Sequence, residues 1–262
     1  MDTAVSGTVG TMRVATFNIL NGRSPDDDRV DPERVAAAIR ELDADVLALQ
    51  EVDRAQARSE YVDLTAVAAE AMGATDHRFV AALSGSPGAT WVAATGDEQP
   101  DAAAYGIALL SRHPVTAWQV VRLPAPRTRV PMWFRPRSLP TWVREEPRVA
   151  VAAEVVTPEG PLRVVATHLS FVTLWNGHQL RTLLRGLPRV PHPTLLLGDL
   201  NMGPARAARI TGMTSLARHV TFPAPRPREQ LDHVLADRPV PAASRAVRLP
   251  LSDHRALVVD LA

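Results

Sequence analysis

The sequence of 262 residues contains no cysteine and no lysine. Because there is no thiol, the chain can form no disulfide bond, no thiolate metal site and no cysteine nucleophile. Every basic side chain other than histidine is an arginine. Together with the many alanines and prolines, this pattern is typical of biased genomic base composition, so a single arginine is weak evidence for phosphate binding.

Long apolar runs and strong net charge are also missing. No run reaches the length of a membrane-spanning helix, and the segment Met1 to Thr11 lacks the apolar core of a signal peptide. The formal net charge of +1 creates no strong field for nucleic acid or an anionic membrane, although a local basic patch could still bind nucleic acid. We therefore expect a cytoplasmic monomer whose residues 1–11 form an N-terminal extension.

Short apolar segments separated by turn residues favour an α/β protein in which strands predominate. Helices are expected at 32–42, 63–72, 175–186 and 203–210. Strands are expected at 13–17, 45–50, 77–83, 89–94, 105–111, 115–122, 148–156, 162–167, 194–197, 230–235, 246–249 and 255–261. No linker divides residues 12–262, so we expect one domain in which two packed sheets are flanked by helices.

One segment, residues 123–146, breaks this pattern. It is rich in proline and carries five arginines between Arg127 and Arg144, with three large aromatic residues, Trp133, Phe134 and Trp142. A long loop without regular structure is usually functional or disordered. We expect it to rim the active site and select the substrate, with Arg135 and Arg137 contacting phosphate. The alternative is that these aromatic residues only pack the loop onto the core.

Polar side chains that can bind metal or phosphate lie at the ends of the apolar segments, where a strand tip holds them rigidly. They are Asn18 in TFNIL, Glu51 in ALQEVD, His168 in VATHLS, Asp199 and Asn201 in LLLGDLNMG, and Asp253 and His254 in LSDHRA. Asp232 in QLDHVLA lies within an expected strand.

This set supplies the groups that hydrolysis of a phosphoester needs. Mg²⁺ prefers oxygen ligands and keeps several waters, so one or two carboxylates such as Glu51 suffice. A histidine oriented by a carboxylate, or a well-placed aspartate, can activate the attacking water. Asn201 and His168 are suited to donate to phosphate oxygens as charge develops.

Each of these residues, taken alone, has a simpler structural explanation. Asn18 can cap a turn, Glu51 can be a solvated residue after a strand, and His168 can hydrogen-bond the backbone. Gly-Asp-x-Asn can be only a turn, and Ser-Asp-His only a cap. The catalytic interpretation depends on the whole set, because every required role is filled beside a buried strand.

The ordered set of motifs TFNIL, ALQEVD, YGIALLSRHPV, THLS, GDLNMGP, LDHVL and SDHRAL resembles the endonuclease/exonuclease/phosphatase superfamily. That group includes apurinic endonucleases, deoxyribonuclease I, neutral sphingomyelinases and inositol-polyphosphate 5-phosphatases. The resemblance covers residues 13–260, least clearly at 123–146. It implies a four-layered α/β sandwich of two mixed sheets flanked by helices.

The resemblance also implies roles for individual residues. The implied metal site consists of Glu51, Asn18 beside it and Asp253, with Mg²⁺ or Mn²⁺ as the cofactor. The implied catalytic groups are His168 as a phosphate contact, Asp199 and Asn201 for the nucleophile and phosphate, and Asp232 orienting His254, which acts as base or phosphate ligand.

Some positions depart from the family pattern. Ile107 stands where many members have asparagine, and His233 where DNA-repair members have an aromatic residue. The stretch TFPAPRPREQLDH resembles bacterial members of unassigned substrate more than any named nuclease. We therefore expect a metal-dependent phosphodiesterase, nuclease or phosphatase.

Two alternatives stay open. One is a binding module that keeps the fold but not catalysis, against which the intact Glu51, Asp199, Asp232 and His254 argue. The other is a membrane-surface phospholipid phosphodiesterase that uses the aromatic residues of the loop, and we favour it less. The partner in the main hypothesis is a phosphate-ester substrate of open class, nucleic acid included.

Overall fold

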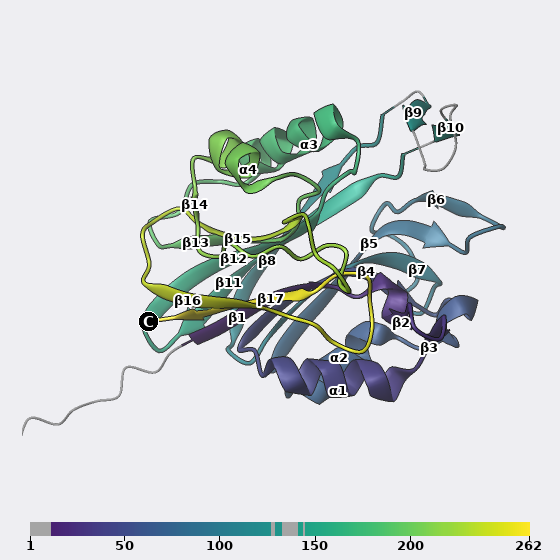
Figure 1. Cartoon of the computed structure of the whole chain (residues 1–262), viewed down its shortest axis with the longest axis horizontal. Helices are drawn as coiled ribbons and strands as arrows, with labels where there is room; N and C mark the ends of the chain where they lie inside the picture. Colours follow the sequence, from purple (N-terminus) through teal and green to yellow (C-terminus); the bar gives the residue numbers. More distant parts are fainter. Residues whose placement is uncertain (1–11, 127–128, 133–140, 144) are drawn as a thin grey trace, which may run out of the picture.

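The computed structural model describes residues 12–262 except 127–128, 133–140 and 144. Within this part of the chain two large mixed sheets pack face to face (Figure 1). The first sheet has the strand order β16-β17-β1-β4-β7-β5-β6. Its strands are β1 (Met12–Asn18), β4 (Val46–Arg54), β5 (Asp76–Gly85), β6 (Trp91–Ala93), β7 (Ala104–Ser111), β16 (Ala242–Val247) and β17 (Ala256–Leu261).

The second sheet has the order β14-β15-β13-β12-β11-β8. Its strands are β8 (Val115–Leu123), β11 (Arg148–Thr157), β12 (Gly160–His168), β13 (Thr194–Asp199), β14 (Thr214–Ser215) and β15 (Asp232–Ala236). Smaller elements are η1 (Leu20–Gly22), β2 (Arg23–Ser24), β3 (Arg29–Val30) and η2 (Ala57–Ser59).

Helices form the crossovers that parallel strands require. Helix α1 (Pro32–Leu42) connects the parallel strands β1 and β4 along the chain, and α3 (Thr173–Gly186) connects the parallel strands β12 and β13. The start of α1 follows from its sequence, because Asp31 accepts hydrogen bonds from the backbone N–H groups of Glu33 and Arg34. Helices α2 (Leu64–Met72) and α4 (Pro204–Thr211) complete the set.

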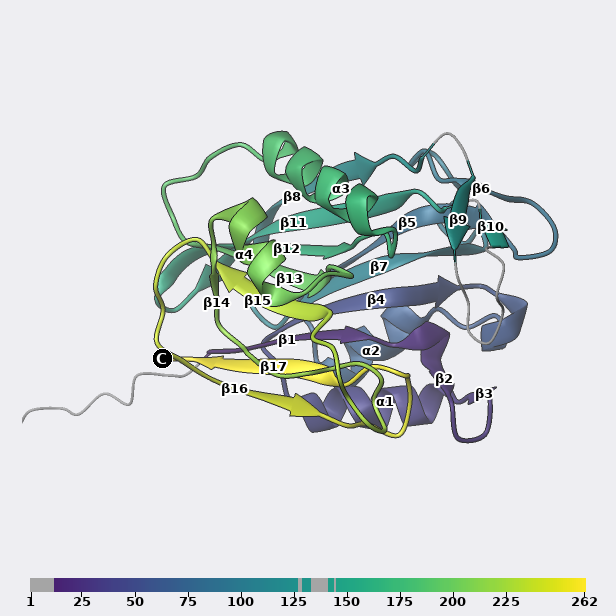
Figure 2. The same ribbon diagram turned by 45° about the horizontal axis from the view of Figure 1, so that its top comes forward.

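The layers follow one another as helices, sheet, sheet and helices. Helices α1 and α2 cover the outer face of the first sheet, and α3 and α4 that of the second (Figures 1 and 2). One apolar cluster, including Val46, Ile107 and Val164, fills the space between the sheets, and a separate cluster lies beneath each helical layer. The four-layered α/β sandwich expected from the sequence is therefore confirmed.

Most expected strands differ by one or two residues at their ends, and two differ by more. The strand expected at 246–249 forms earlier, as β16 at 242–247, because pairing with β17 extends a sequence that has no apolar alternation. The strand expected to end at residue 50 continues to Arg54 through an irregularity at Glu51. The described helices lie close to their expected positions, and none of them is long and apolar enough to cross a membrane.

The segment 123–146 contains two short paired strands, β9 (Val130–Met132) and β10 (Thr141–Val143). In both views this pair projects at the end of the molecule where β6 lies (Figures 1 and 2). Trp142 is 61% exposed, which contradicts packing onto the core for this one aromatic residue. Arg135, Arg137, Trp133 and Phe134 lie outside the described residues, so their roles remain predictions.

Candidate active site

Strand register brings the polar tips of the second sheet together. In the parallel pair β12–β13, His168 lies opposite Asp199, and in the antiparallel pair β13–β15, Asp199 lies opposite Asp232. All three side chains are buried. Asp232 is the first residue of β15 rather than an interior residue, so it belongs to the same sheet edge as the other two.

Asn18 connects this edge to the first sheet. It is the last residue of β1, and its Nδ2 donates to Glu51 Oε1 at 3.1 Å and to Asp199 Oδ2 at 3.2 Å. One amide thus joins carboxylates that come from two different sheets. Its own Oδ1 accepts from the backbone N–H of Leu20 at 3.1 Å, which fixes the amide orientation.

Glu51 reaches the site through a backbone irregularity. It has a φ of 55°, and the register between β4 and β7 shifts between Gln50 and Val52. A bulge of this kind re-aims a side chain that regular alternation would point elsewhere. Burial raises the pKa of Glu51, while the hydrogen bond from Asn18 and the charge of Arg148 oppose that rise.

The Gly-Asp-x-Asn turn has a steric requirement at its glycine. Gly198 has a φ of 144°, and a Cβ there would lie 1.9 Å from the carbonyl oxygen of Thr167. After the turn, Asn201 donates its backbone N–H to Asp199 Oδ1 at 2.9 Å and its Nδ2 to the carbonyl of Leu169 at 2.9 Å. Burial raises the pKa of Asp199, and the neighbouring Asp232 carboxylate raises it further.

Asp232 and His254 form the hydrogen-bonded pair that the resemblance implies. His254 Nδ1 lies 2.9 Å from Asp232 Oδ2, and its Nε2 lies 3.8 Å from Asp199 Oδ2. Burial disfavours the charged imidazolium, but the charge and hydrogen bond of Asp232, with the charges of Asp199 and Asp253, together outweigh burial and raise the pKa of His254 to about 10. Ser252 supports the turn, because its Oγ donates to the Asn18 carbonyl at 2.5 Å and accepts from the His254 N–H.

His168 lies on the other side of Asp199. Its Nε2 is 3.6 Å from Asp199 Oδ2 and 3.3 Å from Asn201 Nδ2, while its Nδ1 is 3.2 Å from Arg148 Nη1. Burial lowers the pKa of His168 well below its ordinary value, and the charges of Arg148 and His254 lower it further.

Sequence reasoning assigned no role to Arg148 or Glu145. Arg148 is the first residue of β11, and its Nη2 donates to Glu145 Oε1 at 3.1 Å. Both side chains are buried. The sequence did contain a signal for these two residues, because the charged side chains of EEPR come directly before an apolar strand. The general abundance of arginine in the chain concealed it. Tyr105 was quoted in a motif without a role. Burial raises the pKa of its hydroxyl, and the charge of Glu51 raises it further, whereas the charge of Arg148 lowers it.

The donor set fits a divalent cation. Glu51, Asp199 and Asp232 place three carboxylates in a largely buried space. Asp232 repels Asp199, and Asp253 repels Glu51, which is a reason for a cation to bind. Asp199, Asp232 and His254 have ligand atoms within 4.8 Å of one another. However, the Asp232–His254 hydrogen bond already occupies Nδ1, and a protonated imidazole is no ligand, so the side of the site formed by Glu51 suits a metal better.

Two of the three metal ligands expected from the sequence need comment. Asn18 presents its Nδ2 to the carboxylates, so direct ligation requires the amide to turn its oxygen inward. Asp253 lies beside His254, and its charge acts on Glu51. The expected substrate contacts Arg135 and Arg137 fall outside the described residues.

Comparisons with known proteins agree with this architecture. The sequence model of the endonuclease/exonuclease/phosphatase family matches residues 15–254. No curated protein matches the chain. Among solved structures, an endonuclease/exonuclease/phosphatase from Beutenbergia cavernae DSM 12333 is 26% identical, with a TM-score of 0.70 over 96% of this chain and 71% of that one.

Two other similar structures carry more specific names. A mannosyl-6-phosphatase from Bacteroides thetaiotaomicron VPI-5482 is 14% identical, with a TM-score of 0.66, and 96% of this chain and 99% of that chain are covered. Sphingomyelinase C from Streptomyces griseocarneus is 17% identical, with a TM-score of 0.60 and coverage of 96% and 99%. At these identities the likeness is one of fold.

Proposed function

We propose, from the premise that the chain belongs to the endonuclease/exonuclease/phosphatase family, that it is a divalent-metal-dependent hydrolase of phosphoester bonds. The family match supports the general class, phosphoester hydrolysis, and the site supports the metal dependence. The observation that carries the proposal is the bridge made by Asn18, which joins Glu51 and Asp199 across the two sheets beside the Asp232–His254 pair.

Glu51 and Asp253 would hold Mg²⁺ or Mn²⁺, with Asn18 orienting Glu51 or turning its oxygen to join them. When bound, such a cation polarises a phosphoryl oxygen and offsets the negative charge that develops there. Asn18 already fixes the Glu51 carboxylate through Nδ2, so this side chain needs little reorganisation to accept a cation.

The proton roles follow from the contacts around Asp199. Its Oδ1 accepts from the Asn201 N–H, and its Oδ2 faces the space between His168 and His254. We assign to Asp199 the orientation and deprotonation of the attacking water, because it is the acceptor at the centre of the site. His254 holds its proton through Asp232 and therefore serves as a donor to a phosphate or leaving-group oxygen.

Asn201 and His168 complete the proposal as donors to the non-bridging oxygens. Asn201 is held rigidly by its backbone and side-chain hydrogen bonds, so it can stabilise charge in the transition state without reorganising. A catalytically silent binding module would need none of these coordinated proton contacts. We therefore favour the enzyme over that alternative.

The substrate is proposed only as a phosphate ester. The mannosyl-6-phosphatase and the sphingomyelinase C differ in what their names say they act on, so the shared fold does not select a substrate. The exposed Trp142 on β10 favours, as a second candidate, a phospholipid phosphodiesterase that works at a membrane surface.

A metal-supplemented screen tests the proposal. Plasmid DNA, abasic DNA, RNA, sphingomyelin, phosphoinositides and bis-nitrophenyl phosphate would be offered to the wild-type chain and to Glu51→Gln. We expect at least one ester to be cleaved in Mg²⁺ or Mn²⁺, with loss of cleavage in excess chelator and in the variant. Cleavage that persists in chelator would contradict metal dependence, and cleavage of none of these esters would contradict the proposal as a whole.

A further inference from the structure

The buried pair of Glu145 and Arg148 lies against a candidate catalytic histidine. Strand β11 pairs antiparallel with β12, with Ala150 opposite Thr167. This register places Arg148, at the start of β11, beside His168, at the end of β12. Arg148 Nη1 lies 3.2 Å from His168 Nδ1, and Arg148 Nη2 lies 3.1 Å from Glu145 Oε1. The guanidinium therefore has one nitrogen on a carboxylate and another on the imidazole.

An arginine in this place decides where the imidazole proton lies. A guanidinium only donates hydrogen bonds, so the ring nitrogen that faces it must accept. His168 Nδ1 is then unprotonated, and the single proton of the neutral ring is on Nε2. A proton on Nδ1 would put two donors face to face in a buried place, where no solvent relieves the repulsion.

On the other side of the ring, this assignment leaves Nε2 facing a second donor. Asn201 Nδ2 is 3.3 Å from His168 Nε2, but the same amide nitrogen donates to the Leu169 carbonyl at 2.9 Å, which fixes its orientation. Both nitrogens are then donors. Among the described residues the nearest acceptor to Nε2 is Asp199 Oδ2 at 3.6 Å, which is too long for a good hydrogen bond. Two donors, one on the buried His168 and one on the half-buried Asn201, thus converge on a place suited to an anionic oxygen.

We propose that the Glu145–Arg148 pair is a positioning device that locks His168 in the tautomer with its proton on Nε2, so that His168 donates to a phosphate oxygen and does not exchange protons as an acid or base. Arg148 acts through His168 and has no assigned contact with the substrate. The pair also ties the end of the segment 123–146 to the site, because Glu145 belongs to that segment.

The catalytic part of this inference rests on the proposed function, whereas the tautomer does not. A first experiment therefore needs no substrate. In protein labelled with ¹⁵N-histidine, long-range ¹H–¹⁵N correlations report which nitrogen of each ring is protonated, and the His168 ring is assigned by its absence in His168→Gln. We expect neutral His168 with its proton on Nε2 at pH 7. A proton on Nδ1, or on both nitrogens, would overturn the proposal even if the chain hydrolyses phosphoesters.

A second experiment removes the donor. Arg148→Met keeps the length of the side chain, and we expect a mixture of tautomers or a switch to the Nδ1–H form. For the best substrate from the screen, kcat should fall by about 10- to 100-fold while KM changes little, as for other residues that orient a catalytic group. Arg148→Lys, which keeps the charge and one donor, should recover part of the Nε2–H signal and part of kcat.

Arg163→Met provides the matched control. Arg163 is as buried as Arg148, with 6% of its surface exposed, and it also pairs with a glutamate, Glu154, but near the opposite end of β12. This variant should lose stability without any change in the His168 tautomer or in kcat. Equal kinetic losses in the two variants, or an unchanged tautomer in folded Arg148→Met, would show that Arg148 is only structural. If Arg148→Met does not fold, the wild-type spectrum still decides the question.

Discussion

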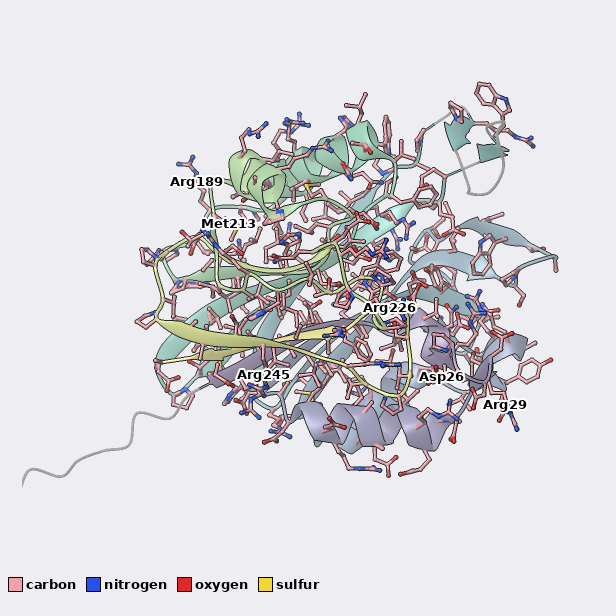
Figure 3. The ribbon with its side chains drawn as sticks, viewed as in Figure 1. Asp26, Arg29, Arg189, Met213, Arg226 and Arg245 are labelled. Atoms are coloured by element: carbon pink, nitrogen blue, oxygen red, sulfur yellow. The ribbon has the colours of Figure 1, made fainter. Side chains whose placement is uncertain are left out.

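The two ends of the sandwich handle charge in opposite ways. At the end away from the candidate site, Asp260 receives hydrogen bonds from Arg13 Nε at 2.6 Å and from Arg245 Nη1 at 2.7 Å; Arg245 is labelled on β16 in Figure 3. Although burial opposes it, these arginines hold the pKa of Asp260 below its ordinary value. At the site end, burial raises the pKa values of Glu51 and Asp199.

This difference separates stability from function within one fold. Charges at the far end are paired and partly solvated, so they stabilise the folded state over a wide pH range. Carboxylates at the site end are crowded and largely buried, which is unfavourable until a cation or a proton relieves them. The same strands carry both arrangements, and their opposite ends therefore respond differently to mutation, metal and pH.

The largest contrast is expected between two glutamates. Glu51→Gln at the site end should lower turnover by about 10³-fold or more, because the carboxylate proposed to bind the cation is lost. Glu154→Gln near the far end, where Glu154 pairs with Arg163, should lower Tm and leave turnover nearly unchanged. Steady-state kinetics and thermal melts of both variants check this expectation. A similar loss of turnover in both would remove the functional distinction between the two ends.

A smaller effect on turnover is expected from Asp232→Asn. Loss of the charge that holds the proton on His254 lets burial lower the pKa of His254 from about 10. If the protonated form is the active one, activity is lost as pH rises through this pKa, so the alkaline limb of the pH–rate profile should move to lower pH. Turnover at pH 8 should fall by about 10²-fold. An alkaline limb that stays in place would refute the donor role of His254.

The pH dependence of stability should have opposite signs at the two ends. The raised pKa of Asp199 means that the metal-free folded state keeps a proton that the unfolded state has released, so this contribution to stability is lost as pH rises toward the raised value. Without metal, Tm should fall with rising pH less steeply in Asp199→Asn than in wild type. The difference is at most about 1.4 kcal/mol per pH unit.

Asp260→Asn is the far-end counterpart. The lowered pKa of Asp260 gives a contribution that is present at neutral pH and lost as pH falls through that pKa. This variant should be less stable than wild type at pH 7, with the difference shrinking in acid. Melts in chelator between pH 3 and pH 8 distinguish the two cases, and slopes of the same sign would contradict the comparison.

The smallest effect is expected in the segment 123–146. Trp142→Ala removes an exposed ring and leaves the buried carboxylates in place, so it should raise KM a few-fold for a large or membrane-bound substrate and leave a small nitrophenyl ester unaffected. The double change of Arg135 and Arg137 to Ala tests the same idea for residues outside the described part. Equal effects on large and small esters would argue against substrate selection by this segment.

Sequence patterns predicted the layers well because they depend on apolar periodicity and on local signals. Examples of such signals are Asp31, which caps the start of α1 before Pro32, and Gly73, which ends α2 in a left-handed conformation. Strand tips were also readable, since Asn18, His168 and Asp199 each follow an apolar run. The strand at 242–247 was misplaced because its side chains show no alternation and its position depends on pairing with β17.

The contacts between the two sheets, and those around the buried charges, could not be predicted from local sequence patterns. Nothing local indicates that Asn18 reaches Asp199 in the other sheet, since the two residues are 181 positions apart. The role of Arg148 depends on the register of β11 against β12, which the sequence does not specify. The bulge at Glu51 is a third example, because its positive φ is imposed by the surrounding sheet on a residue that rarely adopts it.

The hydrogen-bonded bridge made by Asn18 has a consequence for how this protein is inactivated. Two separate sheets meet at the seam that its Nδ2 spans, and a widening of that seam by only about half an ångström would stretch a 3.2 Å hydrogen bond beyond its useful length. Neither sheet has to lose any of its own hydrogen bonds for this to happen. Mild heating should therefore abolish hydrolytic activity at a temperature below Tm. A preparation with full secondary structure can still be inactive. Storage conditions are better judged by turnover than by circular dichroism.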